Sequence, residues 1–200
     1  MVHHWSKAID NKQPLRILFI DFEKAFDRVS HNLLIDKFKS FNVDPILIRW
    51  LCSFLSNRRQ RAKISTLFTE WLTLNGAMSQ GSWLGPLCFV SLINDLHSTC
   101  LTHKFVDDTT LSELILSKEQ SDMQNHLNSV SKWSESALMK INWKKTKEMV
   151  IAQAKFKESC LPLEYNGVTI EQVSSFKLIG VSVNTAIRWN DHIDIIKDKA

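Results

Sequence analysis

Two apolar segments that carry aspartates, one at its end and one in its middle, most constrain how this chain can fold. The first is Leu15-Arg16-Ile17-Leu18-Phe19-Ile20-Asp21, and the second is Lys104-Phe105-Val106-Asp107-Asp108-Thr109-Thr110-Leu111. Each run has the length and residue types of a buried strand, so each leaves carboxylate oxygens at the end of a hydrophobic segment. Charged groups in such places repel one another unless a cation neutralises them. The two runs therefore predict a shared site for divalent metal ions.

The second run predicts a strand, a turn at Asp107 and Asp108, and a returning strand that ends at Leu114. Because successive strand residues point to opposite faces, we expect Asp107 to be the stronger metal ligand. If the strand before Asp21 lies beside this hairpin, Asp21 and Asp107 can share two ions about 3.5–4 Å apart, as in-line phosphoryl displacement requires. Asp27 is a poorer candidate ligand.

An ordinary turn is the alternative interpretation of the aspartate pair, since Asp favours turns and accepts local backbone hydrogen bonds. A calcium-binding loop is disfavoured because no acidic residues follow at alternating positions. Spacing alone does not decide between an ordinary turn and a catalytic site.

The other elements follow from capping residues, helical periodicity and turn residues. We expect five helices: from Ser30 to Phe41, after Pro45, from Pro86 to Leu96, from Met123 to Leu138 and from Asp191. We also expect a loop over 76–86, a hairpin at Asn166-Gly167 and one strand from Phe176 to Val183. The loop opens onto a helix start, where free N–H groups can meet an anion.

Composition sets broad limits on function. The 200 residues carry 25 Lys and Arg against 21 Asp and Glu, a net charge of +4 that permits a nucleic-acid partner without requiring one. The four cysteines lie far apart, and none has the spacing of a metal site. No signal peptide or membrane-spanning segment is evident. We expect a soluble intracellular protein with no membrane partner, and the sequence leaves the compartment and oligomeric state open.

Three motifs in order resemble the reverse transcriptase of non-LTR (LINE-type) retrotransposons. They are Phe19-Ile20-Asp21-Phe22-Glu23-Lys24-Ala25-Phe26-Asp27, then Ser79-Gln80-Gly81-Ser82-Trp83-Leu84-Gly85-Pro86, then Phe105-Val106-Asp107-Asp108-Thr109. The resemblance extends over about residues 15–200. It implies an α+β fold, the polymerase palm, in which a central antiparallel sheet carries the carboxylates and helices back it.

The resemblance also implies roles for individual residues. Asp21 and Asp107 match the metal-binding aspartates, and Asp108 matches their less essential catalytic neighbour. Four residues match nucleotide-binding positions: Phe26, under the incoming sugar; Gln80 and Gly81, in a loop that holds nucleotide and template; and Lys145, near the polyphosphate. Structural alternatives remain for these four, as a core aromatic, a turn or a solvated basic loop. Arg58, Arg59 and Arg61 are candidates for phosphate contacts, although a charge run is often only a solvated face.

The activity implied is RNA-directed DNA synthesis, in which a primer 3′-OH attacks a dNTP on an RNA template with two Mg²⁺ ions, or Mn²⁺, as cofactors. We expect residues 1–14 to be a remnant of the fingers, 15–185 the palm and 186–200 the start of the connection to the thumb, with fingers and thumb largely missing. Met78, Phe105-Val106, Trp143 and Ile179 depart from the family's usual residues, and none of them removes a metal ligand. The alternative is an inactive or domesticated retrotransposon remnant that binds nucleic acid without polymerising it.

Overall fold

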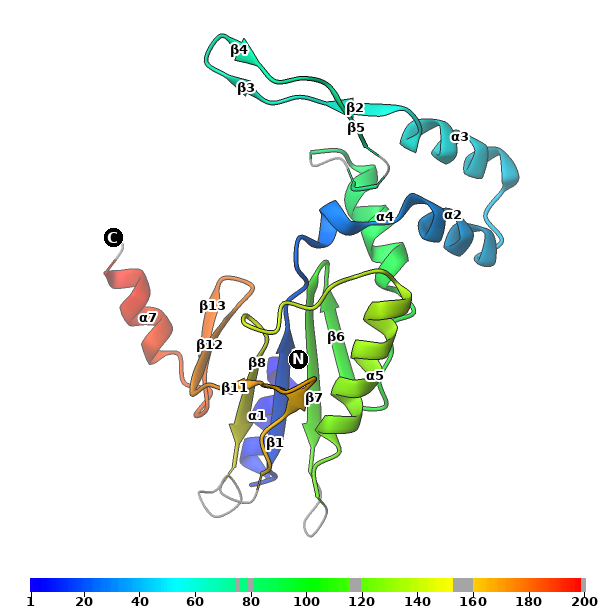
Figure 1. Ribbon diagram of the computed structural model, residues 1–200. Coiled ribbons are helices and arrows are strands. Elements are labelled where there is room, and N and C mark those ends of the chain that lie inside the picture. Colours follow the sequence, from blue (N-terminus) through cyan, green and yellow to red (C-terminus); the bar gives the residue numbers. More distant parts are fainter. Residues whose placement is uncertain (75, 79–80, 116–119, 153–159, 199–200) are drawn as a thin grey trace. The chain divides into compact units, whose positions relative to one another are not determined.

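The computed structural model of the chain describes residues 1–74, 76–78, 81–115, 120–152 and 160–198 (Figure 1). These residues form two compact units. The sheet unit comprises residues 1–22, 97–133 and 141–200, and the helical unit comprises residues 23–96 and 134–140.

A five-stranded sheet in the order β11-β8-β1-β7-β6 forms the centre of the sheet unit (Figure 1). Strand β1 (Leu15–Ile20) lies in the middle and pairs antiparallel with β7 (Asp108–Leu114) and with β8 (Lys147–Ile151). Strand β6 (Leu101–Phe105) extends the antiparallel pairing beyond β7, and the short β11 (Glu171–Gln172) runs parallel to β8. The predicted antiparallel palm sheet is confirmed.

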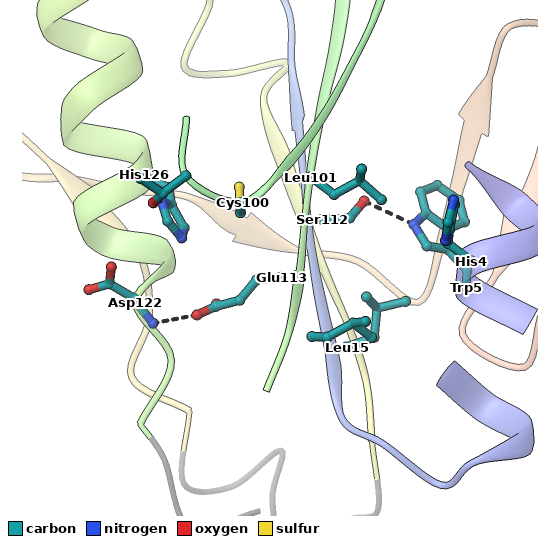
Figure 2. A pocket seen from close by; sticks show the side chains of 11 residues that line it. His4, Trp5, Leu15, Cys100, Leu101, Ser112, Glu113, Asp122 and His126 are labelled. Carbon is teal, nitrogen blue, oxygen red and sulfur yellow. Dashed lines mark hydrogen bonds between the residues drawn. The ribbon is translucent and has the colours of Figure 1, made fainter. Parts of the chain in front are cut away.

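Helices cover both faces of this sheet, which explains why all six residues of β1 are buried. Leu15, Ile17 and Phe19 pack in one cluster with Trp5 of helix α1 (Val2–Asp10). Helix α5 (Met123–Ser136) buries one apolar stripe, made of Met123, Leu127 and Val130. Figure 2 shows α1 and α5 on opposite sides of the strands. A strand covered on both faces is apolar along nearly its whole length, and in β1 the single exception is Arg16.

Small hairpins complete the sheet unit. Strands β9 (Glu164–Tyr165) and β10 (Val168–Thr169) join at Asn166-Gly167, both with positive φ, as the sequence predicted. The prediction of one strand from Phe176 to Val183 is wrong. The segment forms β12 (Ser175–Leu178) and β13 (Val181–Asn184), because Ile179 and Gly180 adopt φ of 48° and 83° and reverse the chain. Helix α7 (Asn190–Lys197) follows.

The helical unit contains the short 3₁₀ helix η1 (Ala25–Arg28) and the helices α2 (His31–Ser40), α3 (Pro45–Leu55) and α4 (Leu84–Ile93). The Ser30 hydroxyl accepts a hydrogen bond from the Leu33 amide at 3.5 Å, which confirms the predicted cap of α2. Asp44 caps α3 at the Ile46 amide, 2.6 Å away, with Pro45 in the first turn. These caps explain where both helices begin.

A two-stranded extension, which we call the arm (Arg58–Leu74), also belongs to the helical unit. Its outgoing side carries β2 (Arg58–Gln60) and β3 (Lys63–Ile64), and its returning side carries β4 (Leu67–Phe68) and β5 (Leu72–Leu74). Strand β2 pairs with β5, and β3 pairs with β4, both antiparallel.

Candidate active site

Asp21 is positioned by the strand that precedes it and by the segment that precedes β8. Its carbonyl oxygen accepts a hydrogen bond from the Asn142 amide at 2.8 Å, and its own amide donates to Thr146 Oγ1 at 3.4 Å. Thr146 is fully buried. The backbone of Asp21 is therefore fixed on both sides at the end of the buried β1 strand.

Asp107 and Asp108 lie where β6 turns into β7. The sequence prediction that both occupy the turn is wrong in one detail, because Asp108 already pairs with Phe105 as the first residue of β7. The two-residue turn consists of Val106 and Asp107, and Val106 takes a φ of 56°. A two-residue connection is the tightest way to join antiparallel strands, which leaves the second aspartate within the strand.

The register between β1 and β7 brings the two acidic segments together. Ile20 pairs with Thr109, so the residues one step further along, Asp21 and Asp108, lie side by side at the same end of the sheet. Thr109 is buried, and its hydroxyl has no hydrogen-bond partner among the residues that the structure describes. The predicted meeting of the two strand ends thus occurs.

Electrostatics agree with this proximity. The pKa of Asp21 is raised, chiefly by burial; the Lys145 ammonium opposes the shift, the Asp107 carboxylate adds to it, and a hydrogen bond with the Asn142 side chain lowers it. The pKa of Asp108 is also raised, by burial and then by the charges of Asp107 and Asp21. Three carboxylates therefore act on one another, and a bound cation would relieve their repulsion.

A pocket of about 280 Å³ opens beside these residues. Asp21 and Asp108 line it, whereas Asp107 does not. Lys144, Lys145 and Lys147 supply positive charge to the pocket lining. The apolar part of the lining includes Phe19 and Phe176, whose rings stack with centroids 4.0 Å apart. Lys147 is held by Glu171, 2.5 Å away. The pocket thus combines carboxylates with lysines, a lining that suits an anionic ligand bound together with metal ions.

The donor atoms fit a hard divalent cation, since Mg²⁺ prefers carboxylate oxygens and water. Among the described residues, however, no three or more Asp, Glu, His or Cys side chains already form a metal-binding group. Asp21 and Asp107 are the residues that would hold such ions, with Asp108 beside them.

The other predicted site residues belong to the helical unit. Phe26 is half-buried and stacks on the buried Phe89, with ring centroids 4.8 Å apart. Gly81 has a φ of 84°, and a Cβ built there meets nothing within 4 Å, so backbone conformation rather than space requires glycine. Gln80 lies outside the described residues. Arg58, Arg59 and Arg61 lie on the outgoing side of the arm.

Sequence reasoning assigned no role to three polar residues around the carboxylates: Thr109, Asn142 and Thr146. The strand pattern classes Thr109 as a core position and gives no sign that its hydroxyl lacks a partner. Asn142 follows a buried Ile141 that bridges to Phe22, a pairing between segments far apart in sequence. No local signal could have revealed either arrangement.

A larger pocket, about 360 Å³, lies at the opposite end of the same strands (Figure 2). Several of its polar side chains are engaged in hydrogen bonds. Glu113 accepts hydrogen bonds from Ser121 and from the Asp122 amide, both at 2.6 Å, and His126 Nδ1 lies 2.9 Å from Ser98 Oγ. The Glu113 bonds tie the end of β7 to the residues just before α5, and the His126 contact joins α5 to the segment before β6. We interpret the pocket as part of the scaffold.

No helix among the described residues is long and apolar enough to cross a membrane.

Comparisons with known proteins identify a matching family and several relatives. The family described as "Reverse transcriptase (RNA-dependent DNA polymerase)" matches residues 3–183. Two relatives from Drosophila melanogaster are each 26% identical over 96% of this chain: a probable RNA-directed DNA polymerase from transposon BS and the RNA-directed DNA polymerase from mobile element jockey. This chain spans 22% of the length of each.

Solved structures show the same fold in telomerase. Apo telomerase from Candida tropicalis superposes with a TM-score of 0.57 at 14% identity, over 92% of this chain and 37% of that one. The same enzyme with a fragment of telomeric RNA gives 0.59 at 14% identity, over 92% and 32%. The family matches residues 3–183, and the relatives come from mobile elements. The chain therefore belongs to the reverse transcriptase (RNA-dependent DNA polymerase) family and resembles its non-LTR retrotransposon members.

Proposed function

We propose that residues 15–185 form the palm of an RNA-directed DNA polymerase, with residues 1–14 part of the fingers region and 186–200 leading to the thumb. One observation carries the proposal: Asp21 and Asp108 lie side by side where β1 ends and β7 begins, within the electrostatic influence of Asp107. Partially buried carboxylates whose pKa is raised by burial and by a neighbouring carboxylate, as for Asp21 and Asp108, are expected where metal ions act on phosphates.

Each residue has a distinct part in this proposal. Asp21 and Asp107 hold two Mg²⁺ ions, or Mn²⁺, and Asp108 supports them from the first position of β7. When bound, such ions activate the attacking primer 3′-OH and stabilise the departing pyrophosphate oxygen. Lys145, which lines the pocket, binds the polyphosphate of the dNTP and donates a proton to the leaving pyrophosphate.

The helical unit supplies the nucleotide and template contacts of the proposal. The Phe26 ring lies against the sugar and disfavours a ribose 2′-OH by steric clash. Gln80 and Gly81 hold the nucleotide and template base, and the missing Gly81 side chain lets the backbone approach closely. Arg58, Arg59 and Arg61 contact phosphates of the RNA template or DNA primer.

Primer extension tests the polymerase. The 200-residue protein is incubated with an RNA template, a DNA primer, dNTPs and Mg²⁺, and with Mn²⁺ in parallel. We expect extension that Asp21→Asn and Asp107→Asn abolish. Asp36→Asn is the control, because Asp36 is an exposed helix residue that pairs with Lys39 at 2.9 Å. Extension that survives both active-site substitutions would refute the assignment.

Metal binding gives a second measurement that does not depend on turnover. Mn²⁺ binding, followed by electron paramagnetic resonance, should weaken in the Asp21→Asn protein and stay unchanged in the Asp36→Asn protein. Nucleic-acid binding without extension and without Mn²⁺ binding at Asp21 would instead identify the chain as an inactive remnant.

A further inference from the structure

The arm carries an unusual arrangement of arginines and aromatic rings. Its pairing shifts by one residue along its length: Gln60 pairs with Leu72, whereas Lys63 pairs with Phe68. Three steps on the outgoing side thus correspond to four on the returning side, which is the signature of a β-bulge. Phe68 and Trp71 are three residues apart and would face opposite ways on a regular strand. The extra residue brings both rings to one face.

Alternate residues of the outgoing side meet these rings. Arg61 lies over both of them, with its guanidinium carbon 3.9 Å from the Phe68 centroid and 4.5 Å from the Trp71 centroid. Arg59 lies 5.7 Å from the Trp71 centroid, and Lys63 Nζ lies 5.5 Å from the Phe68 centroid. Cations and rings therefore alternate along one face of the arm, which we call the cationic-aromatic face (Arg59, Arg61, Lys63, Phe68 and Trp71).

This face is open to solvent and strongly basic. The five residues are all exposed, and the two rings are 51% (Phe68) and 53% (Trp71) exposed. Glu70 is the single acidic residue of the arm, against four Lys and Arg. Exposed large rings are costly in water, and a protein that retains them beside cations has a surface suited to a ligand with both flat apolar faces and negative charge.

We propose that the cationic-aromatic face binds single-stranded nucleic acid, with bases stacking on the exposed parts of Trp71 and Phe68 and with phosphates contacting Arg59, Arg61 and Lys63. Unpaired bases offer free faces to aromatic rings and guanidinium planes, whereas the bases of a duplex are stacked on one another. The inference deepens the proposed function, because a polymerase must hold an unpaired template. The binding itself requires no metal ion.

The opposite face of the arm differs and supplies a matched control. Ile64, Leu67 and Leu72 are aliphatic and exposed, and they offer no ring on which a base can stack. A protein partner would favour this aliphatic side, whereas the charge and the rings favour nucleic acid on the other.

The test is fluorescence anisotropy of labelled 12-nucleotide RNA, single-stranded DNA and duplex RNA, with the full chain in EDTA. Trp71→Ala should weaken single-strand binding by about five- to 150-fold, the range for losing one base stack, and Trp71→Phe should restore most of it. Arg59→Ala should reduce the slope of log K against log salt by about 0.7, one phosphate contact on a single strand. Leu67→Ala should leave both quantities unchanged.

Two results would overturn the inference: unchanged single-strand affinity in Trp71→Ala protein, or duplex RNA bound as tightly as single strands. In the first case, sedimentation shows whether Trp71→Ala changes self-association, which would identify the face as a protein contact. Comparing RNA with DNA shows which strand the arm prefers. Asp107→Asn should abolish primer extension and leave single-strand binding in EDTA intact. A failure of the proposed polymerase activity is therefore distinguishable from a failure of the proposed binding face.

Discussion

The buried ion pair between Arg16 and Glu148 offers a quantitative test of how the sheet holds the candidate site. Both side chains are almost completely buried, at 4% and 1% exposure, on the two strands that flank each other at the centre of the sheet. Arg16 also donates to Leu161 O at 2.6 Å and to Ser121 Oγ at 3.1 Å. One guanidinium thus joins β1, β8 and the residues before α5 and β9.

Glu148→Gln keeps the shape of the side chain and leaves Arg16 as an uncompensated buried cation. Removing one partner of a buried pair costs about 3–5 kcal/mol, which is a large part of the roughly 5–15 kcal/mol that stabilises a typical domain. The double variant Arg16→Met with Glu148→Leu removes both charges. It should recover most of the loss, because two apolar side chains carry no desolvation penalty.

The assay is urea unfolding followed by tryptophan fluorescence and circular dichroism, with m-values compared to verify a common transition. Asp36→Asn is the control, since its exposed pair with Lys39 should contribute less than about 1 kcal/mol. The Glu148→Gln loss should persist in 1 M NaCl because salt screens buried charges weakly. A loss below about 1 kcal/mol, or one that salt removes, would contradict the reasoning that the pair is buried and essential.

Three further outcomes follow from the site. Because burial and the charges of Asp107 and Asp21 raise the pKa of Asp108, this residue should contribute a loss of stability as pH rises from the ordinary aspartate pKa to the raised one. Asp108→Asn, melted in EDTA at several pH values, should make the loss smaller than in the unsubstituted protein, and the raised pKa of Asp21 accounts for part of what remains. Thr109→Val should raise the melting temperature by removing a buried hydroxyl without a partner, and a lowered one would mean that the hydroxyl is satisfied by water. Gly81→Ala should cost about 1 kcal/mol, measured by urea unfolding, because its φ of 84° is unfavourable for a residue with a Cβ; a cost near zero would contradict that conformation.

Much of the site could be predicted from the sequence because its signals are local. Apolar runs that end in acid mark strand ends, so the convergence of Asp21 with the Asp107-Asp108 segment followed from the two runs and one assumption about their neighbourhood. The turn at Asn166-Gly167 followed in the same way from residues that tolerate positive φ. The break at Ile179-Gly180 was missed because the flanking residues continue a strand-like pattern on both sides.

Other features depend on pairing between distant segments. The Asn142 backbone amide and the Thr146 hydroxyl reach Asp21 only because the chain returns to β1 more than 100 residues later. The cationic-aromatic face of the arm depends on one extra residue in the returning strand, which shifts the pairing register. The residue pattern of either strand alone does not predict this shift.

By itself, the sequence determined that the run before Asp21 and the segment around Asp107 and Asp108 form strands, that acidic residues lie at their ends and to which family the ordered motifs point, because strand and turn preferences are properties of short stretches. The tertiary structure alone decided that Asp108 opens β7 while Asp107 stays in the turn, that Thr109 lacks a hydrogen-bond partner and that Arg61 lies over two rings. These depend on strand register, which forms only when distant segments pair and which moves every side chain by a face when it shifts by one residue.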